Sequence, residues 1–260
     1  AEYLSQQLSR PVDVLFDESL GLAYGRKGRN VDLIIGKRSM VLFDAKLTKT
    51  DVRTISHLTG KQGRTTVTGL ILVRKDDPAK SLADLKGRKL MLGPEEDAET
   101  NAAVNALLKT EQLSGKVTTE TAGSIDAAVF ALTDEEADAA VVSDFLPPLL
   151  EGCGKVEKGS LRVIGQTEPV PFVEVFATAI VSDEEEQAIR AALQEIKDHP
   201  QVLLAMETKL GFVSAPTKTP VASSEKPTVE EWTDWRGPRR DGLSRFVPTS
   251  LPETLEAVWS

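Results

Sequence analysis

Hydrophobic and polar residues follow two different patterns along the first 213 residues of the chain. Some segments are short apolar runs bounded by glycine, proline or serine, which is typical of buried strands. Others repeat their apolar residues every three or four positions, which is typical of helices. The strands expected from this pattern are 12–16, 31–36, 65–73, 89–92, 117–121, 139–142, 161–164 and 173–181. The expected helices are 2–8, 81–87, 100–113, 125–132, 145–150, 182–197 and 200–211.

Helix-capping residues agree with these boundaries. Ser124 precedes one apolar helical segment, and Ser182 with Glu185 has the spacing of a capping box. Because strands and helices alternate along the chain, the pattern predicts an α/β fold with a mostly parallel sheet.

Composition and charge exclude several classes of protein. The chain has 31 basic and 40 acidic residues, so its formal net charge is 31 − 40 = −9. An acidic surface repels phosphates, so nucleic acid is not an expected partner. No apolar run approaches the length of a membrane span. The single cysteine, Cys153, excludes a disulfide within the chain, and no common catalytic signature is present. We therefore expect no catalytic residues and no metal site.

Three stretches together resemble the phosphonate-type periplasmic solute-binding proteins of ABC transporters. They are residues 3–12 (YLSQQLSRPV), residues 72–76 (LVRKD) followed by 80–89 (KSLADLKGRK), and residues 138–142 (DAAVV). The resemblance covers about residues 1–213. It implies a periplasmic or cell-envelope protein that captures a small-molecule ligand without catalysing a reaction.

The resemblance also implies two Rossmann-like lobes of the periplasmic binding protein type II kind, followed by a C-terminal extension. The expected first lobe comprises about residues 1–74 and 172–213, and the second lobe about residues 75–171. The chain would cross between them near 73–75 and 169–173, and ligand capture would close the lobes about these segments.

The end of the chain differs in composition from the rest. Residues 214–230 contain prolines, threonines and serines and no aromatic residue, which is typical of a linker. Residues 231–244 (EWTDWRGPRRDGLS) and 255–260 (LEAVWS) resemble the opening segment of pyrroloquinoline-quinone (PQQ) β-propeller proteins. This second resemblance implies that residues 231–260 begin a propeller domain, which would be a partner of the lobes.

Three functions remain open from the sequence. The chain is a solute-binding-type domain of a larger envelope protein, or the N-terminal regulatory or docking part of a quinone-dependent dehydrogenase, or a protein-interaction module that has lost its ligand. We expect no cofactor in residues 1–260, whereas a propeller would be the place for PQQ.

The first candidate ligand-binding residues are Lys37, Arg38 and Ser39, which follow an expected strand. Loops at the carboxyl ends of parallel strands line the ligand crevice in open α/β sheets. Two cations and a hydroxyl there suit a carboxylate or phosphate group. The alternative is an exposed turn with solvated charges.

Two further groups of polar residues flank expected strands. Ser143, Asp144 and Phe145 follow the strand 139–142, where they would either contact ligand or cap the next helix. Thr66 and Thr68 would either offer hydroxyl groups to a ligand or only favour the strand.

The last candidates, Glu99, Thr100 and Asn101, belong to an acidic loop. Phosphonate-binding relatives carry a Ser-Thr-Ser turn at this helix start, whereas this chain has residues 97–101 (DAETN). The four carboxylates of residues 95–99 would repel a dianion, so we expect no affinity for phosphonates. The loop would face a cation, or would only complement the helix dipole.

Overall fold

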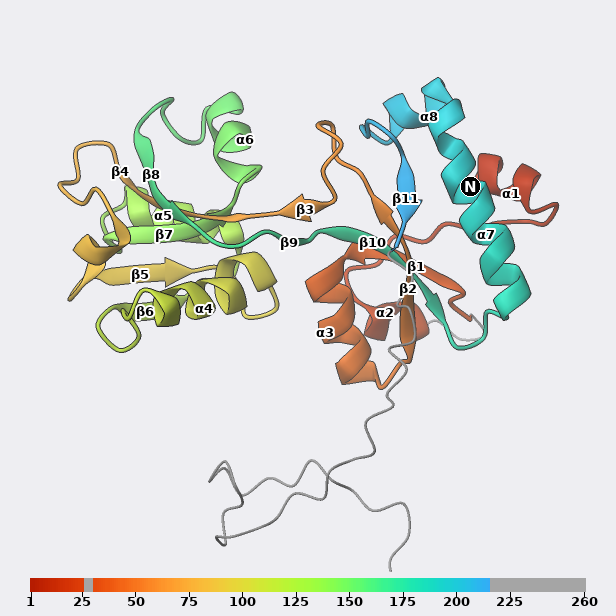
Figure 1. Ribbon diagram of the computed structural model, residues 1–260, viewed down its shortest axis with the longest axis horizontal. Helices are drawn as coiled ribbons and strands as arrows, with labels where there is room; N and C mark the ends of the chain where they lie inside the picture. The colour runs from red at the N-terminus through yellow and green to blue at the C-terminus, as the bar shows by residue number, and fades with distance from the viewer. Residues whose placement is uncertain (26–29, 216–260) are drawn as a thin grey trace, which may run out of the picture. The chain divides into compact units, whose positions relative to one another are not determined.

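The structure of the chain is a computed structural model that describes residues 1–25 and 30–215. Its described strands form two larger sheets, each with helices packed on it, and one short two-stranded sheet (Figure 1). Each larger sheet and its helices make up one lobe, so the expected two-lobed α/β fold is confirmed. The predicted propeller segment, and the predicted linker from residue 216 onward, lie outside the described residues.

The first lobe is built on a four-stranded sheet with the order β1-β10-β2-β11, in which all three pairings are antiparallel. These strands are β1 (Leu33–Lys37), β2 (Val52–Leu58), β10 (Val173–Thr178) and β11 (Phe212–Ser214). Its helices are α1 (Glu2–Gln7), α2 (Leu20–Gly25), α3 (Arg38–Thr48), α7 (Asp183–Glu195), η3 (Ile196–Asp198) and α8 (Pro200–Ala205).

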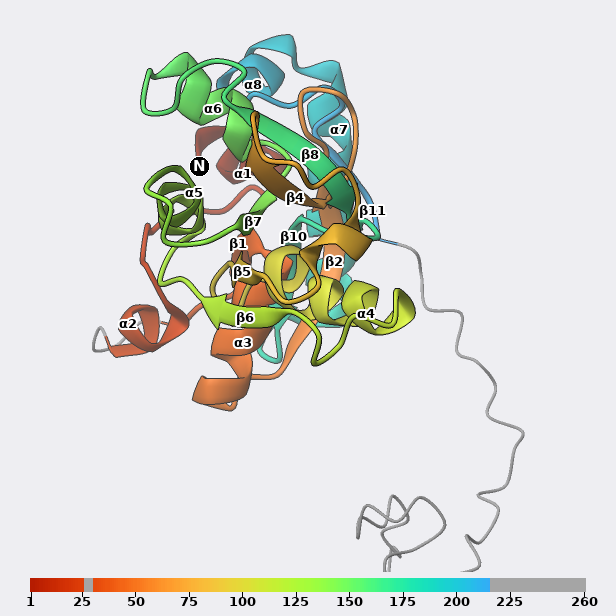
Figure 2. The same cartoon turned by 90° about the vertical axis from the view of Figure 1, so that its left-hand side faces the viewer.

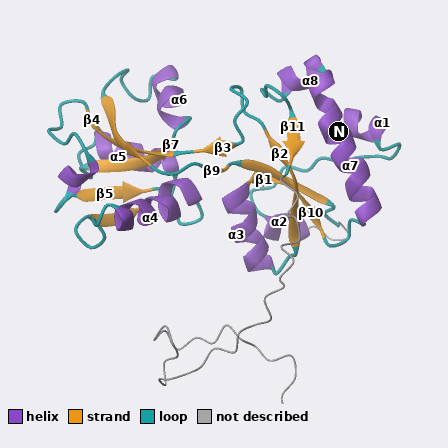
Figure 3. Cartoon of the chain, in the orientation of Figure 1, coloured by secondary structure: helices purple, strands orange, loops and turns teal. Residues whose placement is uncertain are grey.

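Alternating side chains of β10 reach both faces of this sheet. Val175 and Ala177 pack in one core with residues of α1, α7 and α8, whereas Phe176 packs in the other with residues of α2 and α3. Figure 3 shows the two groups of helices on opposite sides of the strands. The sheet is therefore buried on both faces.

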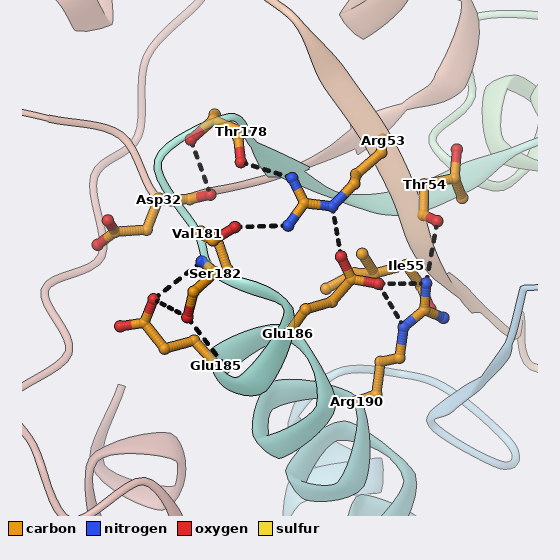
Figure 4. Close-up of polar contacts among 10 residues, drawn as sticks. All are labelled: Asp32, Arg53, Thr54, Ile55, Thr178, Val181, Ser182, Glu185, Glu186 and Arg190. Carbon is orange, nitrogen blue, oxygen red and sulfur yellow. Dashed lines mark hydrogen bonds and ion pairs between the residues drawn. The ribbon is translucent and has the colours of Figure 1, made fainter.

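A polar network fixes α7 to the first sheet (Figure 4). The predicted capping box is confirmed, since Ser182 accepts from the backbone N–H of Glu185 and the Glu185 carboxylate accepts from that of Ser182. The next residue, Glu186, lies between the guanidinium groups of Arg53 and Arg190. Arg53 also donates to the carbonyl oxygens of Thr178 and Val181, so it joins β2 to the segment that precedes α7.

The second lobe is built on a five-stranded sheet with the order β6-β5-β7-β4-β8. Its strands are β4 (Gly69–Arg74), β5 (Lys89–Leu92), β6 (Thr118–Thr121), β7 (Ala139–Ser143) and β8 (Leu161–Gln166). Its helices are η1 (Leu82–Leu85), η2 (Ala98–Ala102), α4 (Ala103–Thr110), α5 (Ile125–Thr133) and α6 (Leu146–Gly152). Residues of η1 and α4 pack on one face of the sheet and residues of α5 and α6 on the other (Figure 2).

A short two-stranded sheet lies where the chain crosses between the lobes. It pairs β3 (Thr66–Val67) with β9 (Val170–Pro171) in antiparallel orientation. We expected the first crossing at 73–75, but β4 already belongs to the second sheet. The expected strand 65–73 is thus two strands, divided at Thr68, and the first crossing lies several residues earlier.

Several local predictions were wrong. The expected strand 12–16 is not a strand in the structure, and its Phe16 is 91% exposed. An isolated strand leaves its backbone groups without partners, and the described residues place no neighbouring strand beside it. The expected loop at Arg38 and Ser39 is the first turn of α3. The prediction of a mostly parallel sheet is also wrong, because among the described strands only β5 pairs in parallel, with β6 and with β7.

Among the described residues, no helix combines the length and apolar composition that a bilayer crossing requires.

Candidate functional site

The side chain of Lys37 joins the two lobes. Lys37 is the last residue of β1, in the first lobe. Its Nζ lies 2.6 Å from Asp97 Oδ1 and 2.6 Å from Glu99 Oε1, and both acids belong to the second lobe. The exposed fractions are 15% for the Lys37 side chain, 5% for Asp97 and 1% for Glu99. One ammonium group is therefore held by two carboxylates away from solvent.

Glu99 has the most enclosed carboxylate of this group. Its Oε1 accepts a second hydrogen bond, 2.6 Å long, from Ser143 Oγ at the end of β7. Its Oε2 is buried and accepts no hydrogen bond from the described residues. A buried carboxylate oxygen without a donor is costly, since hydration is lost and nothing replaces it.

Two glycines allow the turn that carries Glu99 to lie directly on the second sheet. This turn, η2, is a π-helical turn that leads into α4. A Cβ added to Gly69 in β4 would lie 2.1 Å from the carbonyl oxygen of Glu99. A Cβ added to Gly93, just after β5, would lie 2.0 Å from Thr100 Oγ1. The glycines thus bring Glu99 and Thr100 down to the strand ends.

The charges of this group do not cancel. When all three residues are ionised, Asp97 and Glu99 contribute two negative charges and Lys37 one positive charge. Burial raises the pKa of Asp97, the hydrogen bond and charge of Lys37 lower it, and the nearby Glu99 raises it again. The raised pKa of Asp97 means that the surroundings disfavour its ionised form, and with it a net negative charge on this group.

A second group of contacts lies beside the crossing strands. Arg64 Nη1 is 3.1 Å from Asp144 Oδ2, and the Asp144 backbone N–H donates to the carbonyl oxygen of Thr68 over 2.9 Å. The ring of Phe145 lies 5.4 Å from that of Phe172, which follows β9. Ser143 and Asp144 are thus used in contacts other than helix capping, and α6 begins without a side-chain cap.

Arg38 is neutralised within its own lobe. Its Nη1 lies 2.5 Å from Glu174 Oε2, which also accepts a hydrogen bond from Thr54 Oγ1 over 2.8 Å. The other oxygen, Glu174 Oε1, is 3.1 Å from His57 Nδ1. Lys37 and Arg38, which we expected to attract an anion, are therefore both paired with carboxylates of the chain.

The remaining candidates are spread around the same region. Thr66 lies in β3, and Thr68 lies between β3 and β4. Asn101 Nδ2 donates to the carbonyl oxygen of Gly93 over 3.4 Å. Ser39 Oγ is buried without a hydrogen-bond partner among the described residues.

The sequence pattern indicates Lys37, Glu99 and Ser143 as separate candidates but not as a contacting set. It does not indicate Asp97 as a ligand-binding residue, although Asp97 stands in the acidic loop, and it does not indicate Arg64 or Glu174. Arg64 and Glu174 carry no local signal, because their partners are 80 and 136 positions away in the chain. Within the described residues, no cluster of three or more histidine, cysteine or acidic side chains is arranged to hold a metal ion.

Comparison with models of protein families matches residues 1–218 to the family described as "ABC transporter, phosphonate, periplasmic substrate-binding protein". No curated protein matches the chain.

Solved structures share the fold at low sequence identity. XAC2383 from Xanthomonas citri bound to ATP is 19% identical, with a TM-score of 0.66 over 83% of this chain and 86% of that one. PhnD1 from Prochlorococcus marinus in complex with methylphosphonate is 16% identical, with a TM-score of 0.61 over 84% and 85% of the two chains. A binding protein component of an ABC phosphonate transporter from Pseudomonas aeruginosa is 17% identical, with a TM-score of 0.60 over 82% and 74%.

Proposed function

Because the chain belongs to the phosphonate-type family of periplasmic substrate-binding proteins of ABC transporters, we propose that residues 1–213 capture a small solute between their two lobes in the periplasm. The observation that carries this proposal is the contact of Lys37 in the first lobe with Asp97 and Glu99 in the second. A solute bound beside these three side chains would touch both lobes at once.

Access to this place requires the lobes to separate. Asp97, Glu99 and Ser143 are buried, and they belong to the second lobe, whereas Lys37 belongs to the first. Separation would leave the two carboxylates and the hydroxyl on one side and the ammonium on the other. The crossing strands β3 and β9 are the segments about which this motion would occur.

Thermal unfolding of the full 260-residue chain tests the proposal. The solutes would be single amino acids, alkylamines, alkylguanidines, phosphate and methylphosphonate, each at millimolar concentration. A solute that binds only the folded state raises the melting temperature as its concentration rises. We expect at least one of them to do so, with a one-to-one stoichiometry in calorimetry. If none of them binds, solute capture is wrong.

A protein-interaction module is the second candidate function. The observation that favours it is that Lys37 already pairs with both carboxylates, so the lobes are joined by groups of the chain itself. The absence of binding to every solute tested would favour this candidate.

A further proposal concerns residues 231–260. Their motif of tryptophans followed by Arg-Gly-Pro supports the view that they begin a propeller domain, in a larger envelope protein or a PQQ-dependent dehydrogenase. Expression of residues 231–260 with the chain that the reading frame encodes after them tests this. A β-rich circular dichroism spectrum is expected, and PQQ binding with calcium would separate the dehydrogenase from a non-catalytic propeller. A product without β structure would contradict the propeller.

A further inference from the structure

We infer that the solute carries a positively charged ammonium or guanidinium group and that Glu99 binds this group through Oε2. The inference rests on the proposed solute capture and names the chemistry of that site. Three independent features of the described residues support it: an unpartnered oxygen, an unbalanced charge, and the pairing of the nearby cations.

The unpartnered oxygen gives the position. The side chain of Glu99 is 1% exposed, and its two oxygens differ sharply. Oε1 contacts Lys37 Nζ and accepts from Ser143 Oγ, each over 2.6 Å, whereas Oε2 accepts nothing from the described residues. An N–H group of a solute would supply the donor that Oε2 lacks, and a carboxylate accepts most strongly from a charged donor.

The unbalanced charge gives the sign. Asp97, Glu99 and Lys37 together carry one net negative charge when ionised, and all three are largely buried. A buried net charge is unfavourable until an opposite charge joins it. One monovalent cation makes the group neutral, whereas an anionic solute would double its negative charge.

The pairing of the nearby cations excludes the opposite assignment. An anion at this place would need a free cation, yet Lys37 contacts two carboxylates and Arg38 contacts Glu174. Arg64, the next cation along the crossing, contacts Asp144. Each of these three described cations is therefore already held by an acid of the chain.

The test measures by calorimetry how three probes bind the full chain: n-butylguanidinium, the neutral n-butylurea that matches it in size and shape, and the anion methylphosphonate. We expect n-butylguanidinium to bind at least about tenfold more tightly than n-butylurea, and methylphosphonate not to bind. Glu99→Gln should abolish the preference for the charged probe, because an amide keeps the shape and loses the charge.

Lys37→Met provides the decisive variant. Removing the ammonium raises the net negative charge of the group, so n-butylguanidinium should bind about tenfold more tightly than it does to the unaltered chain. Lys89→Met is the matched control, since Lys89 forms a partly exposed pair with Glu120 in the second sheet. It should leave the affinity unchanged. Circular dichroism would check that the Glu99→Gln variant folds. If it does not fold, the tighter binding expected for Lys37→Met still tests the proposal.

The outcomes separate the two proposals. Binding of methylphosphonate that Lys37→Met weakens would keep solute capture and overturn the cationic solute. Equal affinity for n-butylguanidinium and n-butylurea would also overturn the cationic solute and keep solute capture. The same conclusion would follow if another solute binds but n-butylguanidinium binds neither the unaltered chain nor Lys37→Met. Failure of all solutes in the thermal unfolding test would overturn both.

Discussion

Two carboxyl groups of the second lobe have pKa values shifted in opposite directions by their surroundings. Burial raises the pKa of Asp97 despite the contact with Lys37. Asp77 shows the opposite behaviour, because Arg88 donates to its two oxygens over 2.8 and 2.5 Å and lowers its pKa from 3.8 to about 2. The difference lies in the partner. Arg88 binds the Asp77 carboxylate with two parallel hydrogen bonds and reaches Asp138 only at 3.5 Å, whereas Lys37 divides a single ammonium equally between two acids.

The Asp77 pair predicts a pH dependence of stability. Between its unfolded pKa of 3.8 and its folded pKa of about 2, the unfolded chain binds more protons than the folded chain. The stabilisation by this pair is therefore fully present above the unfolded pKa and is lost as the pH falls through the folded one. In urea titrations, Asp77→Asn should lower the free energy of unfolding at pH 7, and most of this difference should be lost by pH 2. A difference that stays constant from pH 7 to pH 2 would contradict this account.

Ser143 predicts a second effect at this scale. Its hydroxyl donates to the buried Glu99 carboxylate, so Ser143→Ala leaves Oε1 with Lys37 alone. Loss of a buried hydrogen bond to a charged group should lower the free energy of unfolding by about 1.5–3 kcal/mol. Ser160→Ala is the control, because Ser160 Oγ donates to a backbone carbonyl at an exposed turn and its loss should change little. Equal effects of the two changes in urea unfolding would refute the role given to Ser143.

At the scale of elements, the sequence predicted what depends on neighbouring residues. The helix caps at Ser124 and Ser182 are confirmed, because the cap and its partner are within three positions of each other. Helix α3 was missed because only two of its residues, Val41 and Ala45, are buried. Its exposed apolar residues Met40, Phe43 and Leu47 obscure the helical period.

Local sequence patterns do not predict whether a strand pairs in parallel or antiparallel orientation. A buried antiparallel strand such as β10 reads as the same apolar run as a parallel one. The assignment of β4 to the second sheet depends on its pairing with β7 and β8, which follow it by about 70 to 90 positions. For the same reason the sequence proposed Lys37, Glu99 and Ser143 separately, since no local pattern records a contact between distant segments.

The contact between η2 and β4 predicts a strong effect of a small change. In Gly69→Ala, the new methyl group would meet the backbone carbonyl of Glu99, which no side-chain rotation relieves. Overpacking of this kind should lower the free energy of unfolding by about 1–3 kcal/mol. It should also displace Glu99 and weaken n-butylguanidinium binding. Gly123→Ala is the control, because no atom lies within 4 Å of its added Cβ. Unchanged stability and binding in Gly69→Ala would show that η2 does not rest on β4 as described.

At the scale of the whole described region, the cross-lobe contact of Arg64 and the cross-lobe contacts of Lys37 differ in strength. Arg64 is 55% exposed, so its pair with Asp144 is largely screened and contributes less than about 1 kcal/mol. The Lys37 group is buried, and loss of its cation would leave two carboxylates together away from water. Separation of the lobes would return those carboxylates to water. We therefore expect the loss of Lys37 to change the arrangement of the lobes rather than to unfold the chain.

Spin labels can measure this change, because Cys153 is the only cysteine of the chain and is exposed in the second lobe. A second label at Lys197→Cys would stand at an exposed position of η3 in the first lobe. We expect Lys37→Met to broaden the distance distribution between the two labels and extend it to longer values. Arg64→Met should change it less, and the control Lys89→Met not at all. Addition of n-butylguanidinium should narrow the Lys37→Met distribution again, because a bound cation restores the charge that Glu99 and Asp97 need. Identical distributions for Lys37→Met and Lys89→Met would mean that the Lys37 contact does not determine how the lobes are arranged.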